Sequence, residues 1–191
     1  MTTKEEEDYA LSLYYSIYKN EEWRRYHSGS YVMPGWTLVG IDDSDWELVT
    51  LGTPGESIMY TQYYHKQFVG SLDMAAYESH FYYQYGIVAY INGVEFYRDH
   101  MPEGPVSPST SSLGVYLVKE YHGVIRPGGE ITPTPSALAV ELHFPQYSGA
   151  MAPEFNAFMA FLASSTPVGS PANCFVYPYA VSLTSYGFNA T

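Results

Sequence analysis

The sequence predicts an all-β protein, an antiparallel jelly-roll-type β-sandwich with a short N-terminal helix. Short runs rich in Val, Ile, Tyr and Phe recur along the chain, and turn residues that include 16 Gly and 13 Pro separate them. No strand alternates with a long helical segment, so the parallel sheets built from βαβ units are not expected. An Asn-Gly pair between two apolar runs adds a strong local indication of a β-hairpin.

The N-terminal residues have the pattern of an amphipathic helix. Between residues 4 and 19 acidic residues come first and Lys19 comes last, which is the order that the helix dipole favours. The apolar positions with helical spacing are Ala10, Leu13, Tyr14, Ile17 and Tyr18. We therefore expect residues 1–21 to form a helical extension that precedes the sandwich.

The expected strands follow this extension in chain order. Residues 100–114 and 126–137 are rich in Pro, Gly and Ser and are expected to form loops. The sandwich is expected over residues 22–165, and residues 166–191 form a C-terminal strand segment that resembles the start of a following module. The runs that predict strands are residues 23–29, 36–52, 59–70, 79–93, 94–99, 113–125, 136–144, 154–163 and 174–188.

The hairpin at Asn92-Gly93 is the most specific local prediction. Both residue types accept the positive φ angles that a two-residue type I′ turn requires. A strict alternation of side chains on the two strands then defines two faces. One face carries Ile87, Ala89, Ile91, Val94, Phe96 and Arg98, and the other carries Val88, Tyr90, Glu95 and Tyr97.

Composition excludes several classes of protein. The chain has 191 residues and is 46% hydrophobic, which suits one globular domain. Its formal net charge of −12 repels phosphate backbones, so no nucleic acid is expected as a partner. No apolar run reaches the roughly 18 residues of a membrane span. Cys174 is the only cysteine, so neither an internal disulfide nor a zinc cluster is expected.

No catalytic motif stands out, and the chain is not expected to be an enzyme. The six histidines are scattered, without the spacing of a metal-binding pair. The sequence also has no Gly-x-Ser-x-Gly nucleophile elbow, no P-loop and no dinucleotide-binding fingerprint. A pair of carboxylates for glycoside hydrolysis stays open, because the separation of two such groups is a three-dimensional quantity. No cofactor is expected, apart from the structural calcium ion considered next.

An acidic loop carries Asp42, Asp43 and Asp45 directly before Trp46. Alternating carboxylates in a loop can bind calcium, although the glycine and the terminal glutamate of an EF-hand are missing. The simpler interpretation is an Asx turn or a helix cap that positions a buried Trp46.

The order of these landmarks resembles the galactose-binding-domain-like β-sandwich modules that are appended to microbial and protist surface or secreted proteins. The resemblance covers residues 22–163, through the segments EEWRRYHSG, PGWTLVGIDDSDWELVTLG, YTQYYHKQF, YGIVAYINGVEFYRDHMPEG, ALAVELHFPQ and EFNAFMAFL. It implies a jelly-roll fold and a non-catalytic module of a larger multidomain protein. The structural landmarks within it are Trp36, Trp46, Asn92, Gly93, Glu141 and His143. The loop after the hairpin departs from the family pattern.

Two functions remain open. The first is carbohydrate binding, with a site formed by Arg98, Asp99, His100, Tyr97 and Tyr82. Against this role for Arg98 stands a plain ion pair with Glu141 at a strand end. The second is a structural or assembly role, in which the sandwich and the N-terminal helix contact partner proteins in a larger assembly. An extracellular or cell-surface location is favoured if the chain is a fragment of a longer protein, and a cytoplasmic one otherwise.

Overall fold

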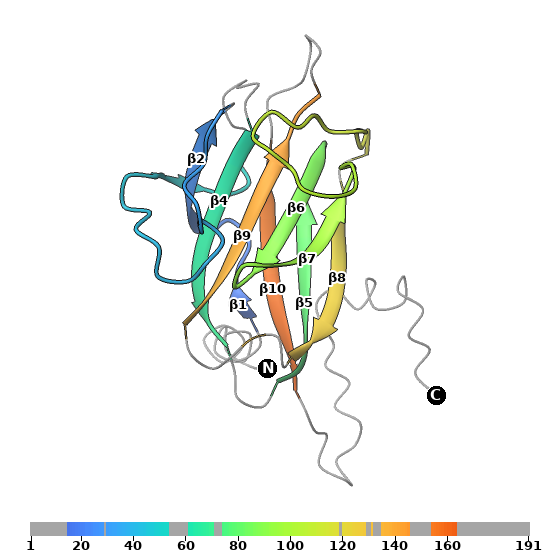
Figure 1. The fold of residues 1–191 in the computed structure, drawn as a ribbon. Coiled ribbons are helices and arrows are strands. Elements are labelled where there is room, and N and C mark those ends of the chain that lie inside the picture. The colour runs from blue at the N-terminus through green and yellow to red at the C-terminus, as the bar shows by residue number, and fades with distance from the viewer. Residues whose placement is uncertain are drawn as a thin grey trace, which may run out of the picture.

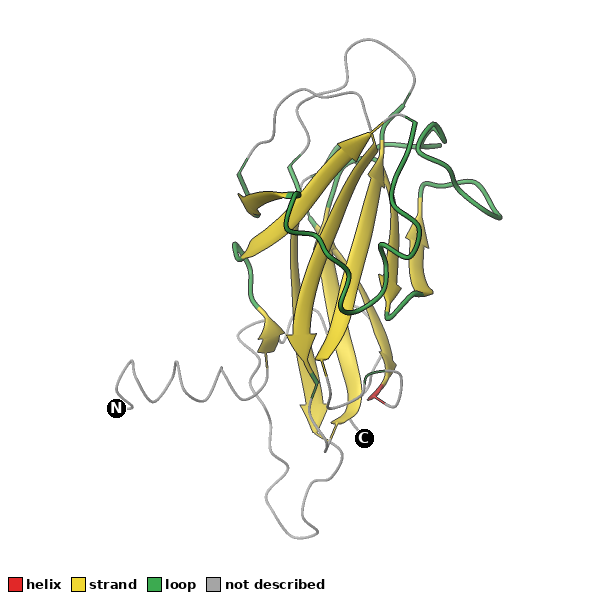
Figure 2. Cartoon of the chain, turned by 60° about the vertical axis from the view of Figure 1, so that its left-hand side comes forward, coloured by secondary structure: helices red, strands yellow, loops and turns green. Residues whose placement is uncertain are grey.

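Two antiparallel sheets pack face to face in the computed structural model (Figure 1). The structure describes residues 15–28, 30–53, 61–70, 74–118, 120–128, 131, 135–145 and 154–163. These residues form strands and loops and contain no α-helix, and thus no helix long and apolar enough to cross a membrane. The short red segment in Figure 2 is a 3₁₀ turn at Gly128. The predicted all-β sandwich is confirmed.

The larger sheet has six strands in the order β3-β2-β4-β9-β6-β7. Non-consecutive strands such as β4 and β9 are neighbours, so the chain crosses repeatedly between the sheets. The central pair β4–β9 runs in register from Gln62 opposite Leu142 to Val69 opposite Pro135. The strands are β2 (Glu22–Ser28), β3 (Glu47–Thr50), β4 (Thr61–Val69), β6 (Gly86–Ile91), β7 (Val94–Asp99) and β9 (Pro135–His143).

The smaller sheet has four strands in the order β1-β10-β5-β8. Its longest pairing joins β10 to β5, from Asn156 opposite Tyr82 to Ala163 opposite Met74. The strands are β1 (Tyr15–Ile17), β5 (Met74–Tyr82), β8 (Tyr121–Pro127) and β10 (Asn156–Ala163).

The main core lies between the two sheets. Alternate residues of each strand point into it, as the two-residue period of a strand requires. The six-stranded sheet contributes Ile87 and Leu138, and the four-stranded sheet contributes Tyr77 and Met159, all four fully buried. Burial of such side chains is the main favourable contribution to the stability of the sandwich.

A second aromatic cluster covers the other face of the six-stranded sheet, which we call the outer face. Its buried members are Trp36, Trp46, Tyr63 and Ala139, with Tyr26 and Tyr90 packed against them. Both tryptophans come from residues 30–46, a loop that folds back over β4 and β9. This loop therefore covers part of a face that a simple sandwich would leave open to solvent.

The Asn92-Gly93 hairpin is confirmed. The φ angles of these residues are 49° and 87°, as a type I′ turn requires, and Ile91 pairs with Val94 across it. The Asn92 amide also ties the turn to β9, because its Oδ1 accepts from the Ala137 N–H at 2.9 Å.

The predicted faces of this hairpin hold for Ile87, Ala89, Ile91 and Phe96 on the core side and for Tyr90 and Glu95 on the outer side, but they are wrong for Tyr97 and Arg98. The pairing shifts between Ala89 and Tyr90, so that Tyr90 lies opposite Glu95 but Ala89 lies opposite Tyr97. This β-bulge inserts one extra residue, Phe96, into β7. Tyr97 consequently turns to the core side and Arg98 to the outer face, the reverse of the strict alternation.

The end of the predicted N-terminal helix is also corrected. Tyr15–Ile17 form strand β1, which pairs with β10, and Ile17 is fully buried. The edge of the four-stranded sheet offers these residues backbone partners and a core position, and both outweigh a helical spacing of apolar residues. Residues 18–21 of the predicted extension are likewise not helical. Residues 1–14, and the C-terminal segment 166–191, lie outside the described residues.

Two predicted strands are shorter in the structure. Residues 36–46 belong to the loop over the outer face, and the strand of this run is confined to Glu47–Thr50. Residues 113–118 are likewise in a loop, and the strand begins at Tyr121. Both loops contain apolar residues that contact the folded sandwich without joining a sheet, which explains why their composition resembles that of strands.

Candidate functional site

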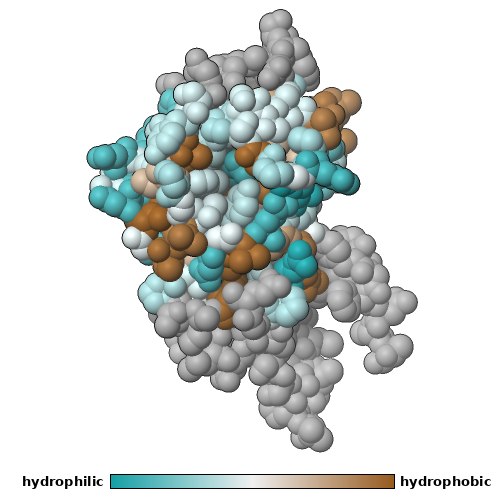
Figure 3. All heavy atoms as spheres, in the orientation of Figure 1, coloured by the Kyte–Doolittle hydropathy of each residue, from teal (hydrophilic) through white to brown (hydrophobic). Residues whose placement is uncertain are grey.

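An open pocket of about 730 Å³ lies on the outer face of the six-stranded sheet. The loop of residues 30–46 forms one wall and the loop of residues 100–113 forms the other, and strands β4, β9, β6 and β7 lie beneath. Figure 3 views the molecule from this side and shows hydrophilic and apolar residues mixed over it. The aromatic and charged residues that line the pocket are Trp36, Tyr63, Tyr90, Glu95, Arg98, Glu103 and Glu141.

Aromatic rings line the bottom of the pocket. The Trp36 ring lies 5.0 Å from that of Tyr63 and 5.8 Å from that of Tyr90, in edge-to-face contacts. Such contacts fix the orientation of the rings as well as burying them. Trp36 is 8% exposed and Tyr63 is fully buried, so close packing holds these rings in place.

One floor residue carries a polar group that lacks a partner. The Tyr63 hydroxyl is buried and makes no hydrogen bond within the described part of the chain. Burial and the nearby Glu141 carboxylate raise the pKa of Tyr63, so the hydroxyl stays in its neutral form. A buried hydroxyl without a partner costs about 1–3 kcal/mol. The hydroxyl is therefore an unused donor buried beneath the pocket surface.

Glu141 holds the centre of the floor through two neighbours. The Tyr90 hydroxyl donates to its Oε1 at 2.5 Å, and the Nε2 of His143 lies 3.2 Å from its Oε2. Burial and the negative charge of Glu141 raise the pKa of Tyr90. His143 is fully buried, and its Nδ1 donates to the Thr110 carbonyl at 2.8 Å. Glu141 and His143, the two landmarks predicted on β9, thus connect the pocket floor to the loop of residues 100–113, which forms one wall of the pocket.

Arg98 reaches the pocket from β7 and is paired with Glu95. Its Nε and Nη2 each donate to one carboxylate oxygen of Glu95 at 2.7 Å, and its Nη1 donates to the Pro102 carbonyl at 2.7 Å. The hydrogen bonds to Glu95 raise the pKa of Arg98 against the opposing effect of burial. The predicted ion pair between Arg98 and Glu141 is therefore wrong, because the bulge brings Glu95 to the same face and within reach.

The structure separates Arg98 from the two residues that follow it. The Asp99 carboxylate accepts hydrogen bonds from the hydroxyls of Tyr83 at 2.5 Å and Tyr116 at 2.7 Å. Burial acts to raise the pKa of Asp99, but these two hydrogen bonds outweigh it, and the pKa lies below its usual value. The Tyr97 hydroxyl joins the same network through Tyr83, at 2.7 Å. Asp99 and Tyr97 thus hold a strand end together.

His100 and Tyr82 lie elsewhere in the fold. The His100 ring packs on Tyr116 at 4.4 Å, and its backbone has a φ of 50°. Tyr82 is on β5 in the other sheet, 7% exposed, and its ring lies 5.7 Å from that of Tyr121. Neither residue lines the pocket, so of the five predicted ligand-binding residues the pocket contains Arg98 alone.

The acidic loop forms an Asx turn. The Asp42 Oδ1 accepts from both the backbone N–H and the hydroxyl of Ser44, and these bonds lower the pKa of Asp42. Asp43 Oδ2 lies 2.7 Å from the Nδ1 of His65, and Trp46 is 6% exposed. The interpretation as a turn that positions a buried Trp46 is confirmed.

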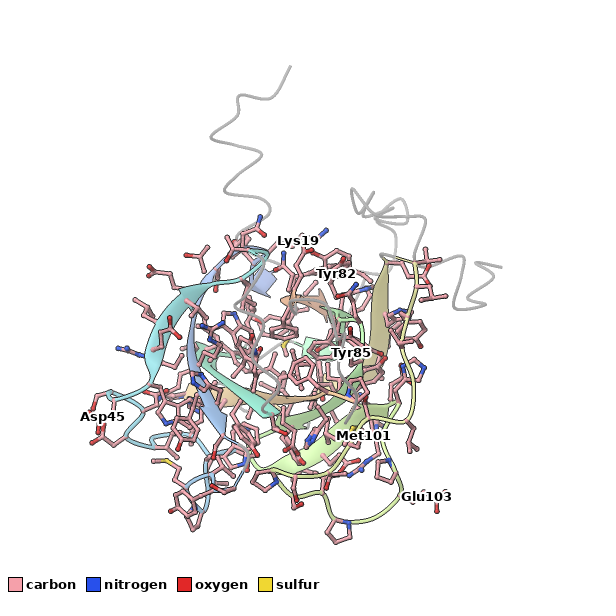
Figure 4. The ribbon with its side chains drawn as sticks, turned by 90° about the horizontal axis from the view of Figure 1, so that it is seen from above. Lys19, Asp45, Tyr82, Tyr85, Met101 and Glu103 are labelled. Carbon is pink, nitrogen blue, oxygen red and sulfur yellow. The ribbon has the colours of Figure 1, made fainter. Side chains whose placement is uncertain are left out.

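Calcium binding by this loop stays a prediction. Asp45 points away from the sheets at the outer edge of the loop (Figure 4). Within the described ranges, no group of three or more His, Cys, Asp or Glu side chains is arranged to hold a metal ion.

Sequence reasoning missed most of the pocket. Tyr63, Tyr90 and Glu95 were not singled out, because they are ordinary strand residues until the sheet order is known. Tyr90 and Glu95 do stand on the same predicted face of the hairpin, which was the one available signal. The residues of the opposing loops could not have been connected to them, because the pocket joins five separate segments of the chain between Val32 and Glu141 that only the sheet order brings together.

Comparison with known proteins supports the fold. No protein-family model matches the chain, and no curated protein matches its sequence. Two solved structures of β-glucuronidases from Bacteroides uniformis, one with cyclophellitol-6-carboxylate aziridine covalently bound, each align with a TM-score of 0.50 and 14% identity, covering 75% of this chain. A glycosyl hydrolase family 2 member from Bacteroides cellulosilyticus aligns with a TM-score of 0.48 and 14% identity, again over 75% of this chain.

The shares of the neighbouring chains are much smaller. This chain covers 17% of each Bacteroides uniformis enzyme and 20% of the Bacteroides cellulosilyticus protein. At 14% identity these likenesses show the fold alone. The fold therefore defines the class of this chain: it is a β-sandwich domain, and a domain of similar fold forms a minor part of each of these longer chains.

Proposed function

We propose that this chain is a non-catalytic module that recognises carbohydrate in the outer-face pocket, as one domain of a larger multidomain protein. The observation that carries the proposal is the combination of a rigid aromatic floor with convergent polar groups in one pocket. Saccharides present apolar ring faces together with hydroxyl groups, and sites of this mixed character suit both. The resemblance to galactose-binding-like modules and the glycosidase chains with a related fold agree with it.

The carboxylates of the pocket support a binding role over a catalytic one. Both carboxylate oxygens of Glu95 accept hydrogen bonds from Arg98, and Glu141 accepts a hydrogen bond from the Tyr90 hydroxyl. Hydrolysis of a glycoside generally requires one carboxyl group that gives up a proton and a second that acts as base or nucleophile. Groups fixed as acceptors are better suited to bind sugar hydroxyls. An extracellular or cell-surface location belongs to the same proposal.

A glycan panel followed by tryptophan fluorescence tests this function. Trp36 lines the bottom of the pocket, so a bound sugar is expected to change its emission. The Trp36→Phe variant should lose that change and keep the fold. If no glycan of a broad panel binds the wild-type chain, the carbohydrate function is wrong.

A second candidate function is protein assembly through residues 113–118. This segment precedes the edge strand β8 and exposes Leu113 by 70%, Leu117 by 91% and Val118 by 68%. Apolar side chains gathered on a surface are typical of protein contacts. Light scattering after size exclusion tests it: Leu117→Ser should reduce any association, and a wild-type chain that stays monomeric at high concentration argues against self-assembly.

A further inference from the structure

The charges around the pocket are predominantly negative. Its described lining contains the carboxylates of Glu95, Glu103 and Glu141, and Arg98 is its sole cationic residue. The chain as a whole has a formal net charge of −12. Charges of one sign around a concave site repel ligands of the same sign and disfavour their approach.

Arg98 already serves as the counter-charge of Glu95. Its three nitrogens already donate to Glu95 and to the Pro102 carbonyl. A ligand carboxylate must either displace Glu95, whose negative charge is then unpaired in the site, or share Arg98 with it through the remaining N–H groups. In neither arrangement does the ligand gain a cation of its own.

The buried groups of the floor suit hydroxyls instead. Glu141 is 4% exposed, and a carboxylate has more acceptor sites than the one that Tyr90 occupies. The Tyr63 hydroxyl lies on the same floor without a partner among the described residues. A ligand hydroxyl can donate to Glu141, whereas a ligand carboxylate cannot and meets the Glu141 charge at close range.

We infer that the pocket selects neutral saccharides and rejects uronic acids, an inference that rests on the carbohydrate-recognising function proposed above. The discrimination is electrostatic, and its chief determinants are the Glu141 carboxylate and the pairing of Arg98 with Glu95. Glu103 contributes less, because it lies at the outside of its loop and points away from the sheets (Figure 4).

Titration calorimetry with matched sugars tests this inference. Neutral methyl glycosides and oligosaccharides of glucose and galactose are compared with the corresponding glucuronates and galacturonates at pH 7 and low salt. We expect each neutral sugar that binds to bind at least about tenfold more tightly than its uronate. Equal or tighter uronate binding overturns the inference and leaves the carbohydrate function intact. If none of the sugars binds, neutral or acidic, the proposed function itself is overturned.

Two variants locate the discrimination. Glu141→Gln removes the charge and keeps an acceptor for Tyr90, so the ratio of neutral to uronate affinity should fall severalfold. Glu95→Gln frees the Arg98 charge and should likewise improve uronate binding. Glu47→Gln is the matched control, because Glu47 pairs with Arg25 outside the pocket. An unchanged ratio in both pocket variants overturns the inference.

Discussion

Arg98 donates to both carboxylate oxygens of Glu95, a residue three positions earlier on the same strand. In a regular strand residues three apart point to opposite faces, so this pair cannot form without an irregularity. The bulge at Phe96 is this irregularity, and it turns the side chains of Glu95 and Arg98 to the same outer face. The charge arrangement of the pocket is thus a direct consequence of one inserted residue.

Replacement of Arg98 by Lys is expected to weaken sugar binding more than folding. A lysine keeps the charge, but it cannot hold Glu95 at two points and bind the Pro102 carbonyl as well. The pair is partly exposed, so the free energy of unfolding should fall by no more than about 1 kcal/mol. Affinity for the preferred neutral sugar should fall about fivefold or more, as measured by calorimetry.

The control for this change is Arg25→Lys. Arg25 makes a similar pair with Glu47, with its Nη2 2.6 Å from Oε2, but on strands β2 and β3 outside the pocket. It should lower stability by a similar amount and leave sugar affinity unchanged. Equal losses of affinity in the two variants would show that Arg98 has no special position at the site.

The hydroxyls of Tyr63 and Tyr90 should respond differently to removal. Tyr90→Phe leaves Glu141 without its donor and should lower the free energy of unfolding by about 1–2 kcal/mol. Tyr63→Phe removes a buried hydroxyl that has no partner among the described residues, so it should leave stability unchanged or raise it by up to about 1 kcal/mol. Urea unfolding measures both.

Sugar affinity is the second property to measure for the Tyr63→Phe and Tyr90→Phe variants. If a ligand hydroxyl bonds to Tyr63, the Tyr63→Phe variant binds the preferred sugar several times more weakly despite its undiminished stability. A Tyr63→Phe protein that is markedly less stable than wild type would contradict the absence of a partner for this hydroxyl.

Acid should weaken the network around Asp99. The pKa of Asp99 is lowered in the folded state, so its contribution to stability is present above its unfolded pKa of about 4 and is lost as the pH falls through the folded value. Asp99→Asn should lower stability at pH 7 and flatten the decline between pH 5 and pH 2. Urea unfolding across this range measures the effect. An equally steep decline in the variant would mean that other carboxylates carry the acid sensitivity.

Gly52 should tolerate alanine much less well than Gly40. Both glycines have positive φ angles, 80° and 75°, and so incur a similar backbone cost of roughly 1 kcal/mol. A Cβ at Gly40 meets nothing within 4 Å, whereas one at Gly52 overlaps Asn20 Oδ1 and lies 2.8 Å from Asn156 Nδ2. That amide pair joins the turn after β1 to β10.

Thermal or urea unfolding of the two glycine variants checks this difference. Gly52→Ala should be destabilised by about 2 kcal/mol more than Gly40→Ala, because it also separates Asn20 from Asn156. Equal losses would mean that the two asparagines move aside without cost.

The sequence was sufficient to predict the fold class and its most local features. The hairpin at Asn92-Gly93 and the turn at Asp42 depend on residues within a few positions of each other, and both were predicted correctly. The bulge at Phe96 was not predictable, because it depends on how β7 meets β6 and on the core position available to this ring. Tyr15–Ile17 form a strand for a similar reason, since a distant partner, β10, determines their structure.

The pocket depends on the same long-range pairing. Arg98 was recognised as a candidate, but its neighbours Asp99 and His100 turn to other parts of the fold. Trp36 and Glu141 were identified as structural landmarks, and only the order of strands β4, β9 and β6 brings them together with Tyr63.

The most direct test of the central claim is the NMR spectrum of the ¹⁵N-labelled chain during titration with a neutral glycan that binds. Recognition in the outer-face pocket predicts shifts at the Trp36 indole N–H, the Arg98 guanidinium and the Gly104 amide, with Tyr82 and the rest of the four-stranded sheet unaffected. Shifts confined to the four-stranded sheet, or no shift with any glycan, would contradict the account.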